Sequence, residues 1–271
     1  MKLIEPQEKY KLQRREERLQ KHNGIHPALT HKKEKLRMAK KKAKPVPEKS
    51  FIMKKMDPKT QNQILTIDSF NENFNLVLHG VAGTGKTYIS LWLALKEVLA
   101  GNYQKVTIIR SIVPSREMGF LPGTAGEKMA VYEIPYQKIC SELFCRGDAY
   151  DILKGKFLIE FLTTSHLRGT TLTDTIIIVD EIQNMNFEEL DTIITRTGNH
   201  CRVIFCGDID QSDLYRSKYD KSGVPQFLDI IETCESFSFV EFDEEDIIRS
   251  GIVKEWIIAK LKYLAEKVKG D

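Results

Sequence analysis

A short glycine-rich segment places the strongest constraint on how this chain can fold. Residues 80–87 read Gly-Val-Ala-Gly-Thr-Gly-Lys-Thr and complete the pattern G-x-x-x-x-G-K-[ST]. The apolar run at 75–79 is typical of a buried strand, and residues 88–97 have the pattern of an amphipathic helix. Strand, glycine loop and helix in this order form a phosphate-binding loop, where backbone N–H groups and the helix N-terminus surround phosphate oxygens. The chain is therefore predicted to bind a nucleoside triphosphate.

The residue types in this loop divide the work of holding a nucleotide. Lys86 would reach the β- and γ-phosphates, and the Thr87 hydroxyl would hold Mg²⁺. A glycine turn before an ordinary helix is the alternative interpretation. The predicted nucleotide-binding set is Gln63, Gly80, Val81, Ala82, Gly83, Thr84, Gly85, Lys86, Thr87 and Tyr88.

Composition indicates a globular protein of the cytoplasm. The chain has 271 residues, of which 41% are apolar and 29% charged, both ordinary values for such proteins. No segment approaches the roughly 18 consecutive apolar residues of a membrane helix, and the charged N-terminus has no apolar signal region. The five cysteines form no C-x-x-C pair. We expect a reducing cytoplasmic setting and no membrane contact.

Charge is distributed unevenly along the chain. Residues 1–50 contain 16 Lys and Arg against 6 Glu, a net charge of +10, although the whole chain carries only +3. Few large apolar side chains occur there, and Pro45-Val46-Pro47 marks a linker. We expect residues 1–50 to be a basic, flexible or helical extension, and residues 51–271 to be the nucleotide-binding domain. A basic block of this size is either a solvated arm or a contact for nucleic acid.

Strand and helix patterns alternate after residue 51. This alternation predicts an α/β fold with a mainly parallel sheet covered by helices on both faces. Strands are expected at 75–79, 105–110, 157–161 (at an edge), 175–180, 202–206 and 236–242. Helices are expected at 88–97, 124–144 and 186–197, from Pro225 onward, and at 251–269.

A pair of carboxylates follows the most β-branched of these strands. Asp180 and Glu181 come directly after Ile-Ile-Ile-Val, and the ends of such strands lie beside the phosphate loop. Asp180 would bind the Mg²⁺ shell, and Glu181 would orient or deprotonate the attacking water. The alternative is a strand that ends in a solvated acidic pair.

Two further patterns resemble superfamily 1 helicases. Residues 180–183 form a D-E-x-Q box, and residues 207–211 read Gly-Asp-Ile-Asp-Gln, where Gln211 would sense the γ-phosphate. Gln63 stands 17 residues before Gly80 and resembles the glutamine with which those enzymes read adenine. Together these elements favour ATP over GTP.

The segments between the ATPase motifs are more specific, and their order resembles the PhoH-like family of phosphate-starvation-associated ATPases. The resemblance covers about Lys59 to Lys260. Ser111 stands where the family usually has Pro, His166 replaces an aromatic residue, and Ser250 follows Arg249 where Arg-His is usual. The matching segments are 110–114, Gly-Phe-Leu-Pro-Gly at 119–123, Glu127-Lys128, 167–172, 180–184, 195–198 and 207–214.

The resemblance implies a single RecA-like P-loop NTPase core that works as an oligomer. Superfamily 1 helicases place ATP between two such cores, and about 55 residues after Leu214 are too few for a second one. An arginine from another subunit would complete the site, which implies a homo-oligomer and, from the family, a hexameric ring. Arg196 and Arg249 are the candidates for that arginine. Arg110 and Arg168 would contact nucleic-acid phosphates or stabilise the subunit contact.

Two hypotheses about function follow. The favoured one is an ATP-hydrolysing, helicase-like motor that acts on RNA or single-stranded DNA, with the basic extension supplying phosphate affinity. The alternative is an ATP-dependent switch or assembly protein that recruits protein partners and uses the extension as a tether. The expected catalytic residues are Lys86, Glu181, Gln211, Arg249 and Arg196, with Thr87 and Asp180 for Mg²⁺ and ATP as the nucleotide. A short chain with a basic front would suit a bacteriophage source.

Overall fold

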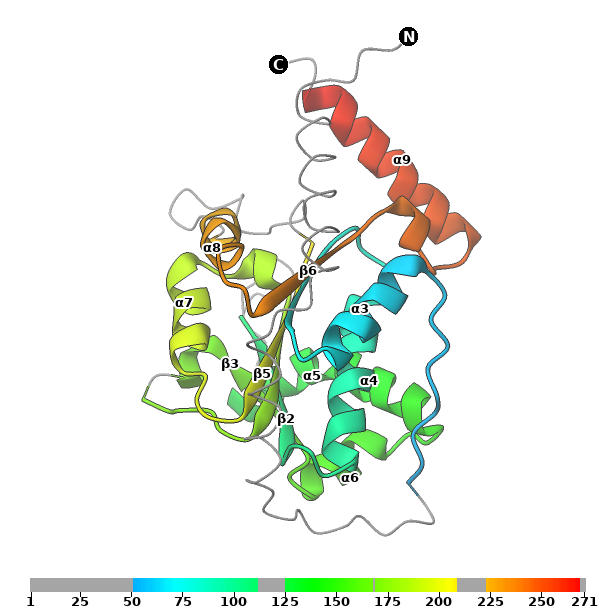
Figure 1. The fold of residues 1–271 in the computed structure, drawn as a ribbon. Coiled ribbons are helices and arrows are strands. Elements are labelled where there is room, and N and C mark those ends of the chain that lie inside the picture. The colour runs from blue at the N-terminus through cyan, green and yellow to red at the C-terminus, as the bar shows by residue number, and fades with distance from the viewer. Residues whose placement is uncertain (1–50, 112–124, 168, 209–222, 269–271) are drawn as a thin grey trace. The chain divides into compact units, whose positions relative to one another are not determined.

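A parallel sheet organises the described part of the chain. The computed structural model describes residues 51–111, 125–167, 169–208 and 223–268. The strand order is β3-β2-β4-β5-β1-β6, and all of these strands pair in parallel (Figure 1). The strands are β1 (Asn75–Gly80), β2 (Lys105–Arg110), β3 (Ile159–Thr163), β4 (Thr175–Asp180), β5 (Cys201–Cys206) and β6 (Phe237–Phe242).

Helices cover both faces of this sheet. The four helices between residues 61 and 155 pack over one face of the sheet and enclose the larger core. The two helices at residues 187–195 and 224–231 enclose a second core on the other face (Figure 1). The helices are α3 (Gln61–Asn71), α4 (Lys86–Leu99), α5 (Ala125–Phe144), α6 (Ala149–Gly155), α7 (Phe187–Thr195), α8 (Val224–Ile231) and α9 (Gly251–Val268). Short 3₁₀ turns are η2 (Thr164–Leu167), η3 (Ile182–Asn184) and η5 (Glu244–Asp246).

Strand β4 lies in the middle of the sheet because its sequence suits burial on both sides. All six of its residues are buried. Successive side chains of a strand point to opposite faces, so Ile176 and Ile178 join the larger core while Ile177 and Val179 join the second. The strand therefore fixes Asp180 at its carboxyl end between two packed layers.

Local side-chain chemistry sets several helix boundaries. Asn186 begins α7 with a capping box. Its side-chain oxygen accepts from Glu189 N, and the Glu189 carboxylate accepts from Asn186 N. Pro225 occupies the first turn of α8, where its missing N–H costs little. Gly85 precedes α4 in the left-handed conformation, at φ 88°. These ends aim the N-termini of α4 and α7 toward the same edge of the sheet as Asp180.

The predicted α/β class is confirmed, and so is the single RecA-like P-loop core with helices on both faces. Three details differ from the expectation. Helix α3, capped by Thr60, and the short α6 had no predicted counterpart, because neither has a strong apolar periodicity. Strand β3 is at the sheet edge as predicted but begins two residues late, since Phe157 has φ 57° and is 84% exposed.

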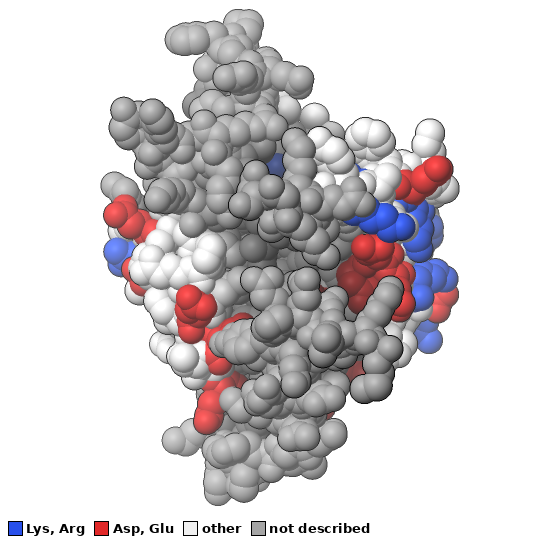
Figure 2. All heavy atoms as spheres, turned by 90° about the horizontal axis from the view of Figure 1, so that it is seen from above, with Lys and Arg blue, Asp and Glu red and all other residues white. Residues whose placement is uncertain are grey.

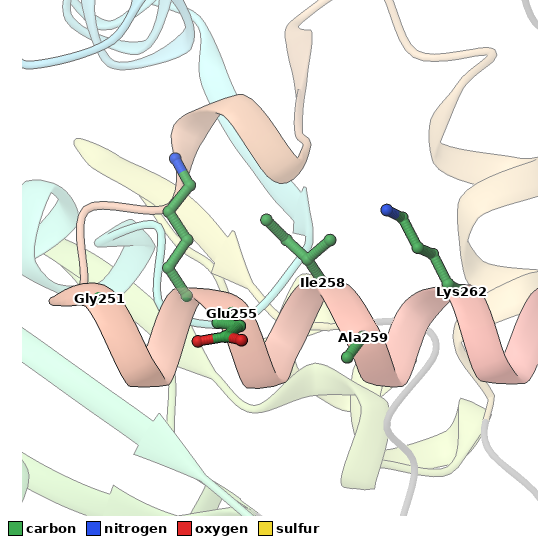
Figure 3. Close-up of a pocket in the computed structure, with 6 residues that line it drawn as sticks. Gly251, Glu255, Ile258, Ala259 and Lys262 are labelled. Carbon is green, nitrogen blue, oxygen red and sulfur yellow. The ribbon is translucent and has the colours of Figure 1, made fainter.

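Helix α9 differs from the other helices in its surroundings. None of its described side chains is buried, and Ile252 and Trp256 are 79% and 70% exposed. A shallow hollow of about 470 Å³ runs along it, lined by Gly251, Lys254, Glu255, Ile258, Ala259 and Lys262. Ile258 and Lys262 point to one side of the helix and Glu255 and Ala259 to another (Figure 3). The described helices include none with the length and apolar character needed to cross a membrane.

The chain separates into two units, residues 1–42 and 43–271, and every element named above belongs to the second. The proposed boundary near residue 50 stays a prediction.

Candidate nucleotide site

The glycine-rich segment forms a loop between β1 and α4. Gly80, Gly83 and Gly85 have φ angles of 109°, 80° and 88°, in the region that favours glycine. Gly80 also has no room for a side chain, because a β-carbon there would lie 2.1 Å from the carbonyl oxygen of Phe242. The Val81 amide donates to that same oxygen at 2.9 Å. Strand β6 therefore holds the start of the loop in place.

Lys86 turns toward the loop itself. Its Nζ donates to the carbonyls of Gly80 at 2.9 Å and Val81 at 2.6 Å, and to the Thr84 hydroxyl at 3.3 Å. Burial lowers the pKa of this ammonium group, and the nearby carboxylate of Asp208 partly offsets the effect. Phosphate oxygens carry a full charge and are stronger acceptors than these carbonyls, so the ammonium is suited to a bound triphosphate.

Asp180 joins β4 to the first turn of α4. The Thr87 hydroxyl donates to its Oδ1 at 2.9 Å, and the Tyr136 hydroxyl donates to its Oδ2 at 2.8 Å. Burial and the neighbouring Glu181 raise the pKa of the Asp180 carboxyl. Mg²⁺ prefers hard oxygen ligands, and a hydroxyl and a carboxylate beside a phosphate loop are such a set. The donors that are present fit the predicted Mg²⁺ site.

Glu181 is held in an unusual backbone conformation. Its φ of 57° is left-handed, which is costly for a residue with a β-carbon and common at functional sites. Gln183 Nε2 donates to its carboxylate, and Gln183 Oε1 accepts from the Asp208 amide at 3.1 Å. Gln183 thus bridges the end of β4 to the end of β5. The carboxylate of Glu181 remains partly exposed, at 38%, as a water-orienting group requires.

Arg110 lies within this site. Its Nη2 is 3.8 Å from Glu181 Oε1, and its guanidinium lies over the ring of Tyr132 with 5.7 Å to the centroid. Arg110 pairs with Asp180 in the register of β2 and β4, which explains the placement. Its predicted contact with nucleic acid or with another subunit stays a prediction. Arg168 and Gln211 lie outside the described residues.

Gln63 is buried beside the loop. Its Nε2 donates to the Thr84 carbonyl at 3.1 Å, and its Oε1 accepts from the Lys59 amide at 2.8 Å. Both ends of the amide thus make internal bonds that brace the loop against the start of α3. Its role in reading adenine stays a prediction. Tyr88 is half-buried in α4 and packs against the larger core.

The chain after β6 passes over the phosphate loop. The Ile248 amide donates to the Gly83 carbonyl at 3.4 Å, and Asn62 Nδ2 donates to Asp246 Oδ2 at 2.6 Å. A β-carbon on Gly83 would lie 3.1 Å from Cγ of Arg249 and 3.4 Å from Cδ1 of Ile257. Arg249, predicted to act on a neighbouring subunit, therefore lies against the loop of its own chain.

Arg196, the other predicted arginine, lies at the opposite end of the sheet. It follows the last turn of α7, and its carbonyl accepts from the Leu172 amide at 2.9 Å, before β4 begins. Its Nε is buried without a hydrogen-bond partner among the described residues. The two candidate arginines are thus placed very differently with respect to their own phosphate loop.

Sequence reasoning missed Tyr136 and the bond between Gln183 and Asp208. Tyr136 is on α5, 44 residues before Asp180, and no motif spacing links them. Ser111, which departs from the family pattern, donates to Glu189 Oε1 at 3.0 Å, and the Thr164 hydroxyl donates to the same oxygen at 2.5 Å. Glu189, the partner of Asn186 in the capping box, thereby also links the ends of β2 and β3.

Comparison with known proteins decides the family. The profile described as PhoH-like protein matches residues 55–261. The chain belongs to the PhoH-like protein family. The matched range contains the phosphate loop, Asp180, Glu181 and Arg249, whose predicted roles stay predictions.

Curated relatives carry the same description. The PhoH-like protein of Mycobacterium tuberculosis (strain ATCC 25618 / H37Rv) is 31% identical over 216 residues, covering 78% of this chain and 59% of its own. That of Bacillus subtilis (strain 168) is 31% identical over 202 residues, covering 74% and 62%. Protein PhoH of Escherichia coli (strain K12) is 32% identical over 175 residues, covering 64% and 49%. The chain spans about half to three-fifths of these bacterial relatives, and the expected bacteriophage source stays a prediction.

Solved structures are similar only at a distance. The Bacteroides sp Pif1 structure in complex with ADP-AlF4 has a TM-score of 0.37 at 15% identity, covering 73% of this chain and 44% of that one. The Sulfolobus solfataricus SWI2/SNF2 ATPase core in complex with dsDNA has a TM-score of 0.39 at 14% identity, covering 71% and 46%.

A matched pair of glycine substitutions tests the contact between the C-terminal segment and the loop. Gly83 and Gly101 both have positive φ, 80° and 73°, but a β-carbon on Gly101 would meet nothing within 4 Å. Gly83→Ala and Gly101→Ala should each lower the free energy of unfolding by about 1–2 kcal/mol through backbone strain. Only Gly83→Ala also crowds Arg249, whose Cγ would lie 3.1 Å from the new β-carbon. It should therefore speed hydrogen exchange across residues 243–257, and equal exchange in both variants would contradict the contact.

Proposed function

We propose that this chain binds ATP with Mg²⁺, hydrolyses it, and works as an oligomeric, helicase-like motor on RNA or single-stranded DNA. The observation that carries the hydrolase part is the Thr87–Asp180 hydrogen bond at 2.9 Å, with Glu181 directly beside it. This bond puts a metal-binding hydroxyl and carboxylate at the phosphate loop, and a second carboxylate within reach of an attacking water.

Four side chains divide three tasks in the proposed reaction. Lys86 neutralises the β- and γ-phosphates, and the oxygens of Thr87 and Asp180 hold Mg²⁺, which supplies charge neutralisation to those phosphates when bound. Glu181 orients the water and accepts its proton. Its strained backbone and its bond from Gln183 keep the carboxylate in one position, which favours the in-line attack.

Nucleic acid is the proposed partner because of the basic extension. Residues 1–50 carry a net charge of +10, enough for several phosphate contacts. Among the described residues visible from above, acidic and basic side chains lie next to each other without a broad basic surface (Figure 2). The extension, with its net charge of +10, is therefore the proposed source of nonspecific phosphate affinity.

A homo-oligomer is proposed from the position of α9, and a hexameric ring only from the family resemblance. Ile252, Val253, Trp256 and Tyr263 are exposed by 42–79%, and large exposed apolar groups of this kind mark interaction surfaces. The same helix reaches the phosphate loop through Ile257, so a neighbouring subunit bound to α9 would lie close to the nucleotide. A cytoplasmic setting is also part of the proposal, since all five cysteines are free thiols.

An ATPase assay with and without RNA and single-stranded DNA tests the proposal. The full chain should hydrolyse ATP, and one of the two nucleic acids should stimulate it. Lys86→Ala should lower activity by roughly 100-fold or more, because charge stabilisation at the phosphates is lost. Glu181→Gln should bind ATP normally and turn it over very slowly.

Deleting residues 1–50 is the matched test of the nucleic-acid part. Basal hydrolysis should persist, because every nucleotide-site residue lies beyond residue 50. Affinity for nucleic acid should fall, and its dependence on salt should become shallower as phosphate contacts are lost. Hydrolysis that no nucleic acid stimulates, with unchanged binding after the deletion, would favour a switch or assembly protein instead.

Mixed variants test whether subunits share the site. An arginine in trans accelerates such chemistry by roughly 10³–10⁵-fold, so Arg196→Ala should be inactive alone. Mixed with Lys86→Ala it should regain part of the activity, because one subunit supplies the loop and the other supplies the arginine. Arg249→Ala should not be rescued in this way, because Arg249 lies against the phosphate loop of the same chain.

Specific activity measured against protein concentration is the companion control. It should rise as subunits assemble, in step with the molar mass. Activity that is independent of concentration, with no rescue in either mixture, would eliminate the shared site. Rescue of Arg249→Ala would instead show that this residue acts on a neighbour.

A further inference from the structure

The metal carboxylate has a second donor that the ATPase motifs do not contain. Tyr136 is fully buried on α5, and its hydroxyl donates to Asp180 Oδ2 at 2.8 Å. The Thr87 hydroxyl takes the other oxygen, Oδ1, at 2.9 Å. Both carboxylate oxygens are therefore fixed, one by the phosphate-loop helix and one by α5.

We propose that Tyr136 is a positioning residue for Mg²⁺, holding the Asp180 carboxylate in the orientation that binds the ion beside Thr87. The inference rests on the proposed ATP site and names a residue for it that neither the loop nor the D-E-x-Q box includes. Tyr136 acts through Asp180 and does not itself bind nucleotide or metal.

The Tyr136 hydroxyl donates to Asp180, and its oxygen accepts from the Arg110 guanidinium. The charged groups that face it are Asp180, Glu181 and Arg110. With one donor on each oxygen, Tyr136 on Oδ2 and Thr87 on Oδ1, the two hydrogen bonds oppose rotation of the carboxylate about its Cβ–Cγ bond.

Loss of this bond should affect metal binding more than nucleotide binding. In Tyr136→Phe the ring stays and only the hydroxyl is removed, so the packing of α5 on the larger core is kept. Asp180 then loses one of its two donors, and its carboxylate can turn away from the position beside Thr87. The phosphate loop is proposed to bind nucleotide through its backbone and Lys86, and not through Tyr136.

Tyr150 offers a matched control. Its ring is 1% exposed on α6, and its hydroxyl donates to a carboxylate, Glu133 Oε2, at 2.7 Å. Tyr150→Phe therefore makes the same chemical change at the same depth, between α5 and α6 and outside the nucleotide site. Any loss of stability from a missing buried hydrogen bond should appear in both variants, as measured by thermal unfolding.

The experiment measures binding of a fluorescent ADP analogue to the full chain, first with a chelator and then across a Mg²⁺ titration. Without metal, Tyr136→Phe should bind within about twofold of the unchanged protein. Its half-saturating Mg²⁺ concentration should rise roughly tenfold, because the loss of one hydrogen bond to a charged group should weaken Mg²⁺ affinity by about that factor. Tyr150→Phe should keep the original Mg²⁺ requirement. An unchanged requirement in Tyr136→Phe, or an equal rise in Tyr150→Phe, overturns the proposal.

A double-mutant cycle keeps the proposal testable if Tyr136→Phe is much less stable. Asp180→Ala should raise the Mg²⁺ requirement by itself, and adding Tyr136→Phe should raise it no further, because the acceptor through which Tyr136 acts is then absent. Additive effects overturn the positioning role while leaving the proposed ATP site intact. If the protein without substitutions binds no ADP analogue at any Mg²⁺ concentration, the proposed function is overturned, and this inference with it.

Discussion

The hydrogen bond from Thr87 to Asp180 is the contact on which the site depends. It links the first turn of the helix after the phosphate loop to the end of the central strand, although the two residues are 93 positions apart. Strand β5 lies between β1 and β4, so the bond spans the carboxyl edge of the sheet. Burial of β4 on both faces packs that strand tightly, so the position of the oxygens proposed to bind Mg²⁺ is set relative to the loop.

The segment after β6 adds a second constraint on the loop. Ile248 and Arg249 of this segment lie against the loop glycines, as do Phe242 at the end of β6 and Ile257 within α9. Asp246 is hydrogen-bonded to Asn62 at the start of α3. Helix α9 begins directly after this segment and carries an exposed apolar surface. A change in loop conformation when phosphate binds would therefore move residues that contact α9, the helix through which we propose that subunits meet. This arrangement gives a physical route from nucleotide to assembly.

Much of this organisation follows from the sequence because its signals are local. The glycine pattern at 80–87 and the β-branched run before Asp180 predict both the strand ends and the chemistry they carry. Helices α3 and α6 were missed because a weak or short apolar pattern gives no periodicity to recognise. Tyr136 and the contact of Arg249 with Gly83 were missed because they depend on three-dimensional packing between distant segments, which no spacing encodes.

A crystal structure with Mg²⁺ and a non-hydrolysable ATP analogue tests the central claim most directly. The account predicts that Lys86 Nζ leaves the carbonyls of Gly80 and Val81 and contacts the β- and γ-phosphates. It also predicts Mg²⁺ between the Thr87 hydroxyl and the Asp180 carboxylate, with the Tyr136 bond intact. An analogue bound elsewhere, or a Lys86 that remains on the loop carbonyls beside bound phosphates, would contradict it.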